Sequence, residues 1–153
     1  IVYEYNITEI DSKAYIDNDD EWITLGQVNA IDKDLDMENT LVYSLTGIEF
    51  DASKSFQIDS KQGLILAKRN TLDRELREKY EFLLTASDGL NNSTAKLIIN
   101  LLDINDNEPK FDQSVYKFQI YENNLNNEKP FAILKARDSD KFNNSYVQYK
   151  ILN

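Results

Sequence analysis

The chain has 153 residues, a formal net charge of −10 at pH 7, and neither cysteine nor histidine. The charge argues against nucleic acid or an anionic membrane as a partner, and the composition excludes disulfides, thiolate zinc sites and histidine-based catalytic triads. No apolar run approaches the length of a membrane span and no signal-like segment opens the chain at Ile1, so we expect a soluble fragment or a mature piece.

Apolar and polar residues alternate over short runs in the first hundred residues, which is typical of half-buried strands. The runs come, in chain order, at residues 3–8, 23–30, 41–45, 56–58, 64–66, 80–86 and 95–101, and a polar loop spans 10–22. Trp22, at the close of this loop, is interpreted as a cover for the end of the core. Seven short strands with turns between them predict an all-β fold, a Greek-key, seven-stranded, immunoglobulin-like antiparallel β-sandwich.

Acidic residues follow these strands in two sets. If each strand reverses direction, the odd-numbered strands end at one pole of the sandwich, the lower pole, and the even-numbered strands end at the other, the upper pole. The lower pole then gathers Glu9, Asp73, Glu75, Asp103 and Asp106, and the upper pole gathers Asp32, Asp34 and Asp88.

The stretch Asp103-Ile104-Asn105-Asp106-Asn107-Glu108-Pro109 follows the seventh predicted strand. It offers carboxylates, carboxamides and backbone carbonyls, and its proline stops a strand. Such oxygen donors are the ligands that calcium prefers. Taken alone, Asp32-Lys33-Asp34 also fits a solvated turn and Asp73-Arg74-Glu75 a local ion pair.

The sequence then repeats itself. Residues 116–122 copy 3–9 at an offset of 113, while 136–140 copy 30–34 and 147–151 copy 41–45 at an offset of 106. We therefore expect a complete unit over 1–107, and the end of a linker with the first three strands of a second unit over 108–153. Three strands cannot close a sandwich, so the second unit is a fragment, is only partly ordered past Pro109, or borrows partners.

These motifs together resemble the extracellular repeats of the cadherin superfamily, one complete repeat followed by the opening third of the next. The residues that carry the resemblance are Glu9, Leu72-Asp73-Arg74-Glu75, Ala86-Ser87-Asp88-Gly89, the stretch 103–109, Glu122-Asn123 and Ala136-Arg137-Asp138-Ser139-Asp140. The resemblance implies up to three calcium ions between successive repeats.

The ligands that the resemblance implies fall into three sets and a further cluster. The outermost ion would take Glu9, Asp73, Glu75 and Asp106; the second Glu9, Glu75, Asp103, the Ile104 carbonyl, Asp106 and Asp140; and the third Asn105, the Asn107 carbonyl, Asp138, Asp140 and a carbonyl near Asn144. A further carboxylate for the third ion normally comes from strand F of the second repeat, which this sequence lacks. Asp32, Asp34 and Asp88 would bind calcium with a preceding repeat, so we expect an interior repeat.

The implied function is a calcium-binding segment of a cell-adhesion protein, with calcium stiffening the joint between repeats. Its expected partners are other cadherin ectodomains, homophilic or heterophilic, and it is expected outside the cell on a membrane-anchored parent. Acceptor motifs for N-glycosylation at Asn6, Asn91, Asn92 and Asn143 fit that location. The alternative is a non-adhesive spacer or mechanical tether. A glycosidase-like carboxylate pair is disfavoured, because too many carboxylates crowd the exposed poles, and no enzymatic activity is expected.

Overall fold

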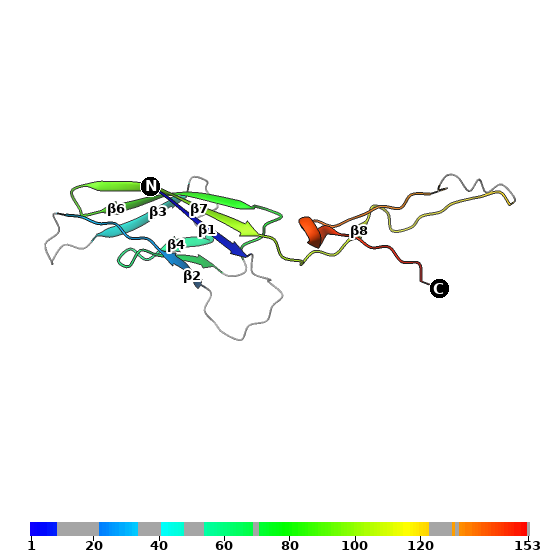
Figure 1. Cartoon of the computed structure of the whole chain (residues 1–153), viewed down its shortest axis with the longest axis horizontal. Helices are drawn as coiled ribbons and strands as arrows, with labels where there is room; N and C mark the ends of the chain where they lie inside the picture. Colours follow the sequence, from blue (N-terminus) through cyan, green and yellow to red (C-terminus); the bar gives the residue numbers. More distant parts are fainter. Residues whose placement is uncertain are drawn as a thin grey trace. The chain divides into compact units, whose positions relative to one another are not determined.

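The computed structural model describes residues 1–8, 22–33, 41–47, 54–68, 71–122, 130 and 132–152 (Figure 1). The chain divides into two compact units, Ile1–Ile104 and Asn105–Asn153, and each is described by itself. The predicted boundary between the sequence repeats, at 107/108, stays a prediction. Glu9, Asp34 and nearly all of the predicted 10–22 loop lie outside the described residues.

The first unit consists of two sheets that enclose a core. One sheet has the strand order β1 (Val2–Thr8), β7 (Asn92–Leu102), β6 (Lys79–Ser87), β3 (Val42–Gly47), and the other has the order β2 (Trp22–Gln27), β5 (Leu64–Lys68), β4 (Phe56–Ile58). All seven predicted strands of this unit are found, and the predicted all-β, Greek-key sandwich is confirmed. Trp22 opens β2 opposite Lys68 and is half-buried.

One pair of neighbouring strands in the sandwich is parallel. β1 pairs with β7 in parallel, from Val2 opposite Lys96 to Thr8 opposite Leu102. The first and seventh strands run in the same direction after an even number of reversals, so they are parallel wherever they become neighbours. β1 is the edge strand of the four-stranded sheet and lies next to β7, so the two strands pair in parallel.

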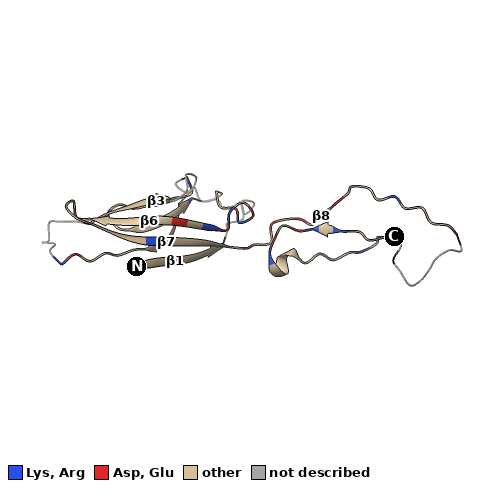
Figure 2. Cartoon of the chain, turned by 90° about the horizontal axis from the view of Figure 1, so that it is seen from above, with Lys and Arg blue, Asp and Glu red and all other residues tan. Residues whose placement is uncertain are grey.

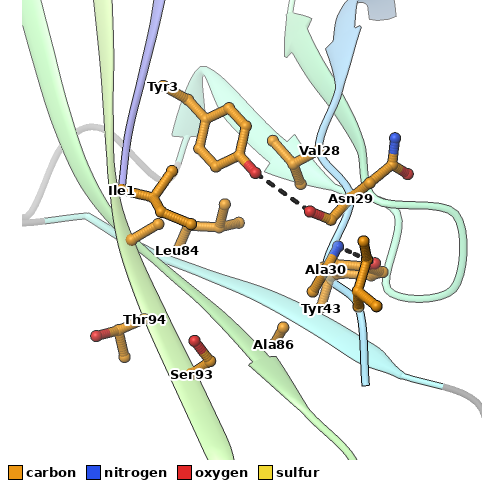
Figure 3. A pocket seen from close by; sticks show the side chains of 12 residues that line it. Ile1, Tyr3, Val28, Asn29, Ala30, Tyr43, Leu84, Ala86, Ser93 and Thr94 are labelled. Atoms are coloured by element: carbon orange, nitrogen blue, oxygen red, sulfur yellow. Dashed lines mark hydrogen bonds between the residues drawn. The ribbon is translucent and has the colours of Figure 1, made fainter. Parts of the chain in front are cut away.

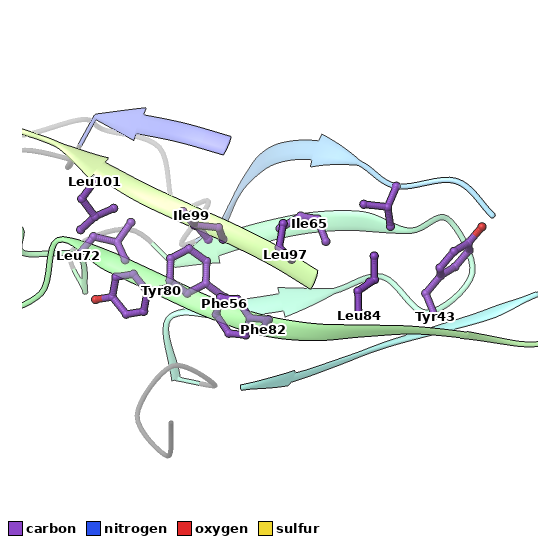
Figure 4. Close-up of a cluster of buried hydrophobic side chains, with 12 residues drawn as sticks. Tyr43, Phe56, Ile65, Leu72, Tyr80, Phe82, Leu84, Leu97, Ile99 and Leu101 are labelled. Carbon is purple, nitrogen blue, oxygen red and sulfur yellow. The ribbon is translucent and has the colours of Figure 1, made fainter. Parts of the chain in front are cut away.

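The core lies between the two sheets and is built by the predicted alternation (Figure 4). Phe82 is central, with 1% of its surface exposed, and Phe56 from the opposite sheet meets it edge-on at a ring-centroid distance of 5.4 Å. Phe56 also meets Tyr80 at 4.9 Å. The other buried apolar residues are Val28, Tyr43, Ile65, Ala67, Leu72, Leu84, Leu97, Ile99 and Leu101. Burial of these side chains is the main stabilising term for the unit.

A charged cluster occupies the outward face of the four-stranded sheet (Figure 2). Glu81 of β6 pairs with Lys79 at 2.7 Å and with Lys96 of β7 at 2.8 Å. Hydrogen bonds from the two lysines lower the pKa of Glu81 to about 2. The neighbouring positions 80 and 82 face the core, so the alternation separates charge from apolar surface within β6.

The turn between β4 and β5 depends on a glycine. Gly63 has a φ of +67°, and a Cβ there would lie 2.4 Å from the Val28 carbonyl oxygen. Asp59 closes the same turn by accepting the N–H groups of Lys61 at 2.8 Å and Gln62 at 2.7 Å, and these two bonds lower its pKa. Position 63 of this turn therefore needs a residue that adopts the left-handed conformation and has no side chain, and only glycine meets both requirements.

The described part of the second unit holds two short strands, β8 (Lys110–Phe111) and β9 (Ala136–Arg137), and a 3₁₀ helix, η2 (Phe142–Ser145). The strands expected over 116–122 and 147–151 are not formed in the described residues, which corrects that prediction. Their counterparts in the first unit, β1 and β3, pair with β7 and β6, and the sequence holds no second copy of those two strands. Apolar residues such as Phe118, 50% exposed, and Ile151, 91% exposed, accordingly lack a sheet to cover them.

Candidate metal centre

The first unit places two predicted ligands around a buried arginine. Asp103 follows directly on β7, and Glu75 lies in the turn at 73–77 that precedes β6. The Arg74 guanidinium contacts both carboxylates, Glu75 through Nη2 and Asp103 through Nε. The Arg74 side chain is 5% exposed, that of Asp103 8% and that of Glu75 20%. The Arg74 guanidinium therefore bridges two carboxylates that come from separate parts of the chain.

Asp73 has a structural role beside this group. Its Oδ1 accepts the N–H of Leu76 at 2.9 Å, and its carbonyl accepts the N–H of Arg77 at 2.9 Å, so it closes the turn in the manner of a helix cap. The side chain lies on the exposed side of the turn, and its Oδ2 is not needed for that bond. Glu9, predicted to join the same ions, lies outside the described residues.

Arg74 contacts two predicted ligands but is not itself in the predicted ligand set. In the sequence, the order Asp-Arg-Glu at 73–75 belongs to the family motif and also fits a local ion pair. The structure adds that the arginine reaches Asp103, 29 positions along the chain, as well as its neighbour Glu75. A contact at that separation depends on the tertiary fold and cannot be derived from spacing.

The second unit gathers its own oxygen donors. The Asn107 amide donates to Asp106 Oδ1 at 2.9 Å and to Asp140 Oδ1 at 2.8 Å, and Asp138 Oδ1 accepts the N–H of Asp140 at 3.0 Å. Asp140 is 5% exposed, and its buried Oδ2 has no hydrogen-bond partner among the described residues. A buried carboxylate oxygen without a donor is costly unless a cation meets it, so these residues fit a hard metal ion.

The remaining predicted ligands around the linker are Ile104, Asn105 and Asn144. Ile104 is half-buried and Asn105 is exposed. Asn144 lies in η2, where its N–H donates to the Lys141 carbonyl at 3.1 Å. That short helix leaves carbonyl groups in the region where the resemblance expects one more oxygen ligand.

A separate acidic pair lies at the upper pole of the first unit. Asp88 Oδ1 accepts the N–H groups of Asn91 at 2.5 Å and Leu90 at 2.7 Å, and these two bonds lower the pKa of Asp88 to about 2. Asp88 thus serves the turn after β6 and also lines the same pocket as Asp32. Asp34, the third member predicted here, lies outside the described residues.

Two further observations concern the surface. The four asparagines of the glycosylation motifs, Asn6, Asn91, Asn92 and Asn143, are all exposed. In the described part of the chain, no helix is long and apolar enough to cross a membrane.

The fold and the acidic groups define a β-sandwich module with clustered oxygen donors at its ends. A family model described as the cadherin domain matches residues 15–102. The chain belongs to the cadherin family. Cadherin domains are adhesion modules and not enzymes, in agreement with the predicted lack of enzymatic activity.

Relatives and solved structures agree with this assignment. The chain is 36% identical over 153 residues to the Fat-like cadherin-related tumor suppressor homolog of Drosophila melanogaster and 35% identical over 153 residues to human Protocadherin-1, with 98% of the chain covered in each case. It spans only 3% and 14% of the lengths of these relatives.

Among solved structures, the extracellular domain of Protocadherin GammaB4 matches with a TM-score of 0.77 at 18% identity, covering 94% of this chain and 24% of that one. Mouse Cadherin-23 EC22-24 matches with a TM-score of 0.67 at 27% identity, covering 94% and 43%. These likenesses confirm the sandwich fold.

Proposed function

We propose that this chain is a calcium-dependent joint in the extracellular part of a cell-adhesion protein. The observation that carries the proposal is the buried Asp140 carboxylate. Its Oδ2 has no hydrogen-bond donor in the described residues, and its Oδ1 accepts from the Asn107 amide, which also donates to Asp106. The first unit contributes the Arg74 group, with two carboxylates for one guanidinium. Both clusters gather carboxylates, and calcium would bind to such oxygen ligands.

The proposed mechanism is electrostatic stiffening. Without calcium, carboxylates of the two units repel one another, and the linker is free to bend. With calcium, the same carboxylates share ions that take six to eight oxygens in irregular geometry, and repulsion becomes bridging. Up to three ions are proposed, held by the residues that the resemblance assigns, Glu9, Asp73, Glu75, Asp103, Ile104, Asn105, Asp106, Asn107, Asp138, Asp140 and Asn144. Extracellular modules bind calcium with dissociation constants up to about 10⁻⁴ to 10⁻³ M, so occupancy would follow extracellular calcium.

The upper pole is proposed as a second half-site. Asp32 and Asp88 line the same pocket, and a cation bound there would offset the like charges of the two carboxylates. Together with Asp34 they would bind calcium jointly with a preceding repeat.

The proposed setting is the cell surface, with other cadherin ectodomains as partners and a membrane-anchored parent. The relatives' names and the exposed glycosylation motifs support this setting. A second candidate, the non-adhesive spacer, is favoured by one observation: the chain corresponds to only 3% of the length of its Drosophila relative. Aggregation of beads coated with the protein, in calcium, separates the two, since a spacer leaves the beads dispersed.

The calcium proposal is tested by calorimetric titration, with melting temperature followed in calcium and in chelator. We expect binding of more than one ion and a higher melting temperature in calcium, because a ligand of the folded state stabilises it. Asp106→Ala should lose most of both effects. Asp112→Ala is the matched control, because this exposed aspartate pairs with Arg137 at 3.3 Å and is no predicted ligand. A wild-type chain that shows neither heat nor a melting shift up to millimolar calcium would refute the proposal.

A further inference from the structure

Two of the four N-glycosylation motifs place their asparagine on the outward face of the four-stranded sheet. In β7, Leu97 and Ile99 are buried in the core, so the even-numbered positions of this strand face outward. Asn92 and Asn100 are both even-numbered, and Asn6 of β1 is paired directly with Asn100. Asn6 and Asn92 therefore share one face, and the eight positions from Asn92 to Asn100 span about 26 Å along β7.

A short hydrogen-bond chain fixes the orientation of the Asn6 carboxamide. The Asn100 amide donates through Nδ2 to Glu4 Oε1 at 2.8 Å and to Asn6 Oδ1 at 2.9 Å. A carboxylate only accepts hydrogen bonds, so Glu4 requires the nitrogen of Asn100 on this side, and Asn6 must then turn its oxygen to Asn100. The Asn6 Nδ2, the atom that carries an N-linked sugar, is left on the side away from Asn100. Because β1 is the edge strand of the sheet, this nitrogen is accessible.

Asn91 is held differently, in the turn between β6 and β7. Its backbone N–H donates to Asp88 Oδ1 at 2.5 Å, and its side-chain Nδ2 donates to Asp88 Oδ2 at 3.3 Å. Its carbonyl accepts the N–H of Asp88 at 3.3 Å. The nitrogen that a sugar would occupy thus faces the Asp88 carboxylate across a tight turn. Among the described residues, the Asn92 side chain makes no hydrogen bond, so Asn92 has no such conflict.

The motifs of Asn91 and Asn92 overlap, and each uses its own hydroxyl residue. Asn91 requires Ser93 and Asn92 requires Thr94. These two residues follow one another on β7, and their side chains lie on opposite sides of the strand (Figure 3). Glycans on adjacent residues would crowd each other, so the two motifs compete for one glycan. The contacts of Asn91 with Asp88 disfavour Asn91 and leave Asn92 as the acceptor.

We propose that the first unit carries N-linked glycans at Asn6 and Asn92 and none at Asn91, so that the outward face of its four-stranded sheet holds one glycan near each end. The step transfers an oligosaccharide from a lipid-linked diphosphate. The bond from the sugar C1 to the phosphate oxygen breaks, a bond from C1 to Nδ2 forms, and one amide proton goes to the lipid diphosphate. Oδ1 is unchanged, so the hydrogen bond from Asn100 to Asn6 persists. The inference rests on the extracellular setting proposed above.

This placement makes the two faces of the first unit unequal. No acceptor motif of the sequence falls on β2, β4 or β5, so the three-stranded sheet stays free of sugar. On the four-stranded sheet, the charges between the two glycans are already paired with one another, Glu81 with Lys79 and Lys96. The glycans would therefore shield the four-stranded sheet from contact with other chains.

The test maps the glycans on the 153-residue chain after secretion from animal cells behind a cleavable leader. Enzymatic release of the glycans in heavy-oxygen water converts each glycosylated asparagine to a labelled aspartate, which peptide mass spectrometry locates. We expect label at Asn6 and Asn92 and none at Asn91. Ser93→Ala removes only the Asn91 motif and should leave the label unchanged, whereas Thr94→Ala removes only the Asn92 motif and should abolish the label there. Label at Asn91 in place of Asn92, or an unlabelled Asn6, would overturn the proposal.

The orientation of the Asn6 sugar is tested after the glycans are trimmed to single N-acetylglucosamine residues. Nuclear Overhauser contacts should join the Asn6 sugar to Thr8 of β1 and not to Lys79, which is paired with Asn100 on the side away from β1. Contacts with Lys79 would contradict the orientation. Calcium is titrated into the same samples. A calcium response without label at Asn6 and Asn92 refutes the glycan assignment alone, and label at both without a calcium response refutes the calcium joint alone.

Discussion

Arg74→Gln tests how positive charge is supplied at the lower pole of the first unit. The change removes a guanidinium that is 5% exposed and contacts two carboxylates, Asp103 and Glu75, themselves 8% and 20% exposed. Removing one partner of a buried ion pair costs about 3–5 kcal/mol, because the remaining charges stay buried without compensation. In chelator, we therefore expect the melting temperature of the first unit to fall by about 15 °C or more.

Calcium should reduce this loss. If ions bind Glu75 and Asp103, they supply the missing charge, and the remaining cost is the lost packing and hydrogen bonding of the arginine, about 1–2 kcal/mol. The assay is urea or thermal unfolding in chelator and in millimolar calcium. Arg77→Gln is the control: it removes the same charge three positions away, from a guanidinium 4.5 Å from the Tyr80 ring, and its cost should be the same in both conditions. An equal loss for Arg74→Gln with and without calcium would refute the reasoning.

Two further predictions concern the sandwich itself. The pKa of Glu81 is lowered from 4.5 to about 2 by its two lysines, so the stability that this group contributes is present above pH 4.5 and is lost as the pH falls from about 4.5 to 2. In acid unfolding, the Glu81→Gln variant should lose no stability from this titration. Identical acid unfolding curves for the variant and the wild type would contradict the prediction. Gly63→Ala should destabilise the first unit by clearly more than Gly89→Ala, because both have positive φ but only the first would clash, at 2.4 Å from a backbone oxygen, while the second has nothing within 4 Å; equal losses in urea would contradict this.

The sequence predicted the first unit well because alternation reports directly which side chains face the core. The runs that end at Leu101 and Ala86 were assigned as strands, and their inward positions, such as Ile99 and Phe82, are buried. The parallel β1–β7 pair could not be predicted, because counting reversals gives the direction of each strand but not which strands become neighbours. The expected strands of the second unit were wrong because a strand needs a partner, and the pattern is present whether or not the partner is.

For the acidic clusters, the sequence predicts which residues gather at one pole but not how deeply each carboxylate is buried. Strand parity placed Glu75 and Asp103 at one pole, and the structure brings both to Arg74. Strand parity could not show that Asp140 is buried, or that its Oδ2 has no hydrogen-bond donor among the described residues, because burial depends on tertiary contacts.

The central claim is that calcium stiffens the joint between the two units, and the most direct test measures the distance distribution across it. The chain has no cysteine, so spin labels can be attached at Leu83→Cys, on an exposed position of β6, and at the exposed Lys117→Cys in the second unit, and read by pulsed electron paramagnetic resonance. We predict a broad distribution in chelator that narrows in millimolar calcium, and a distribution that stays broad in the Asp140→Asn variant. A wild-type distribution of the same width with and without calcium would contradict the account.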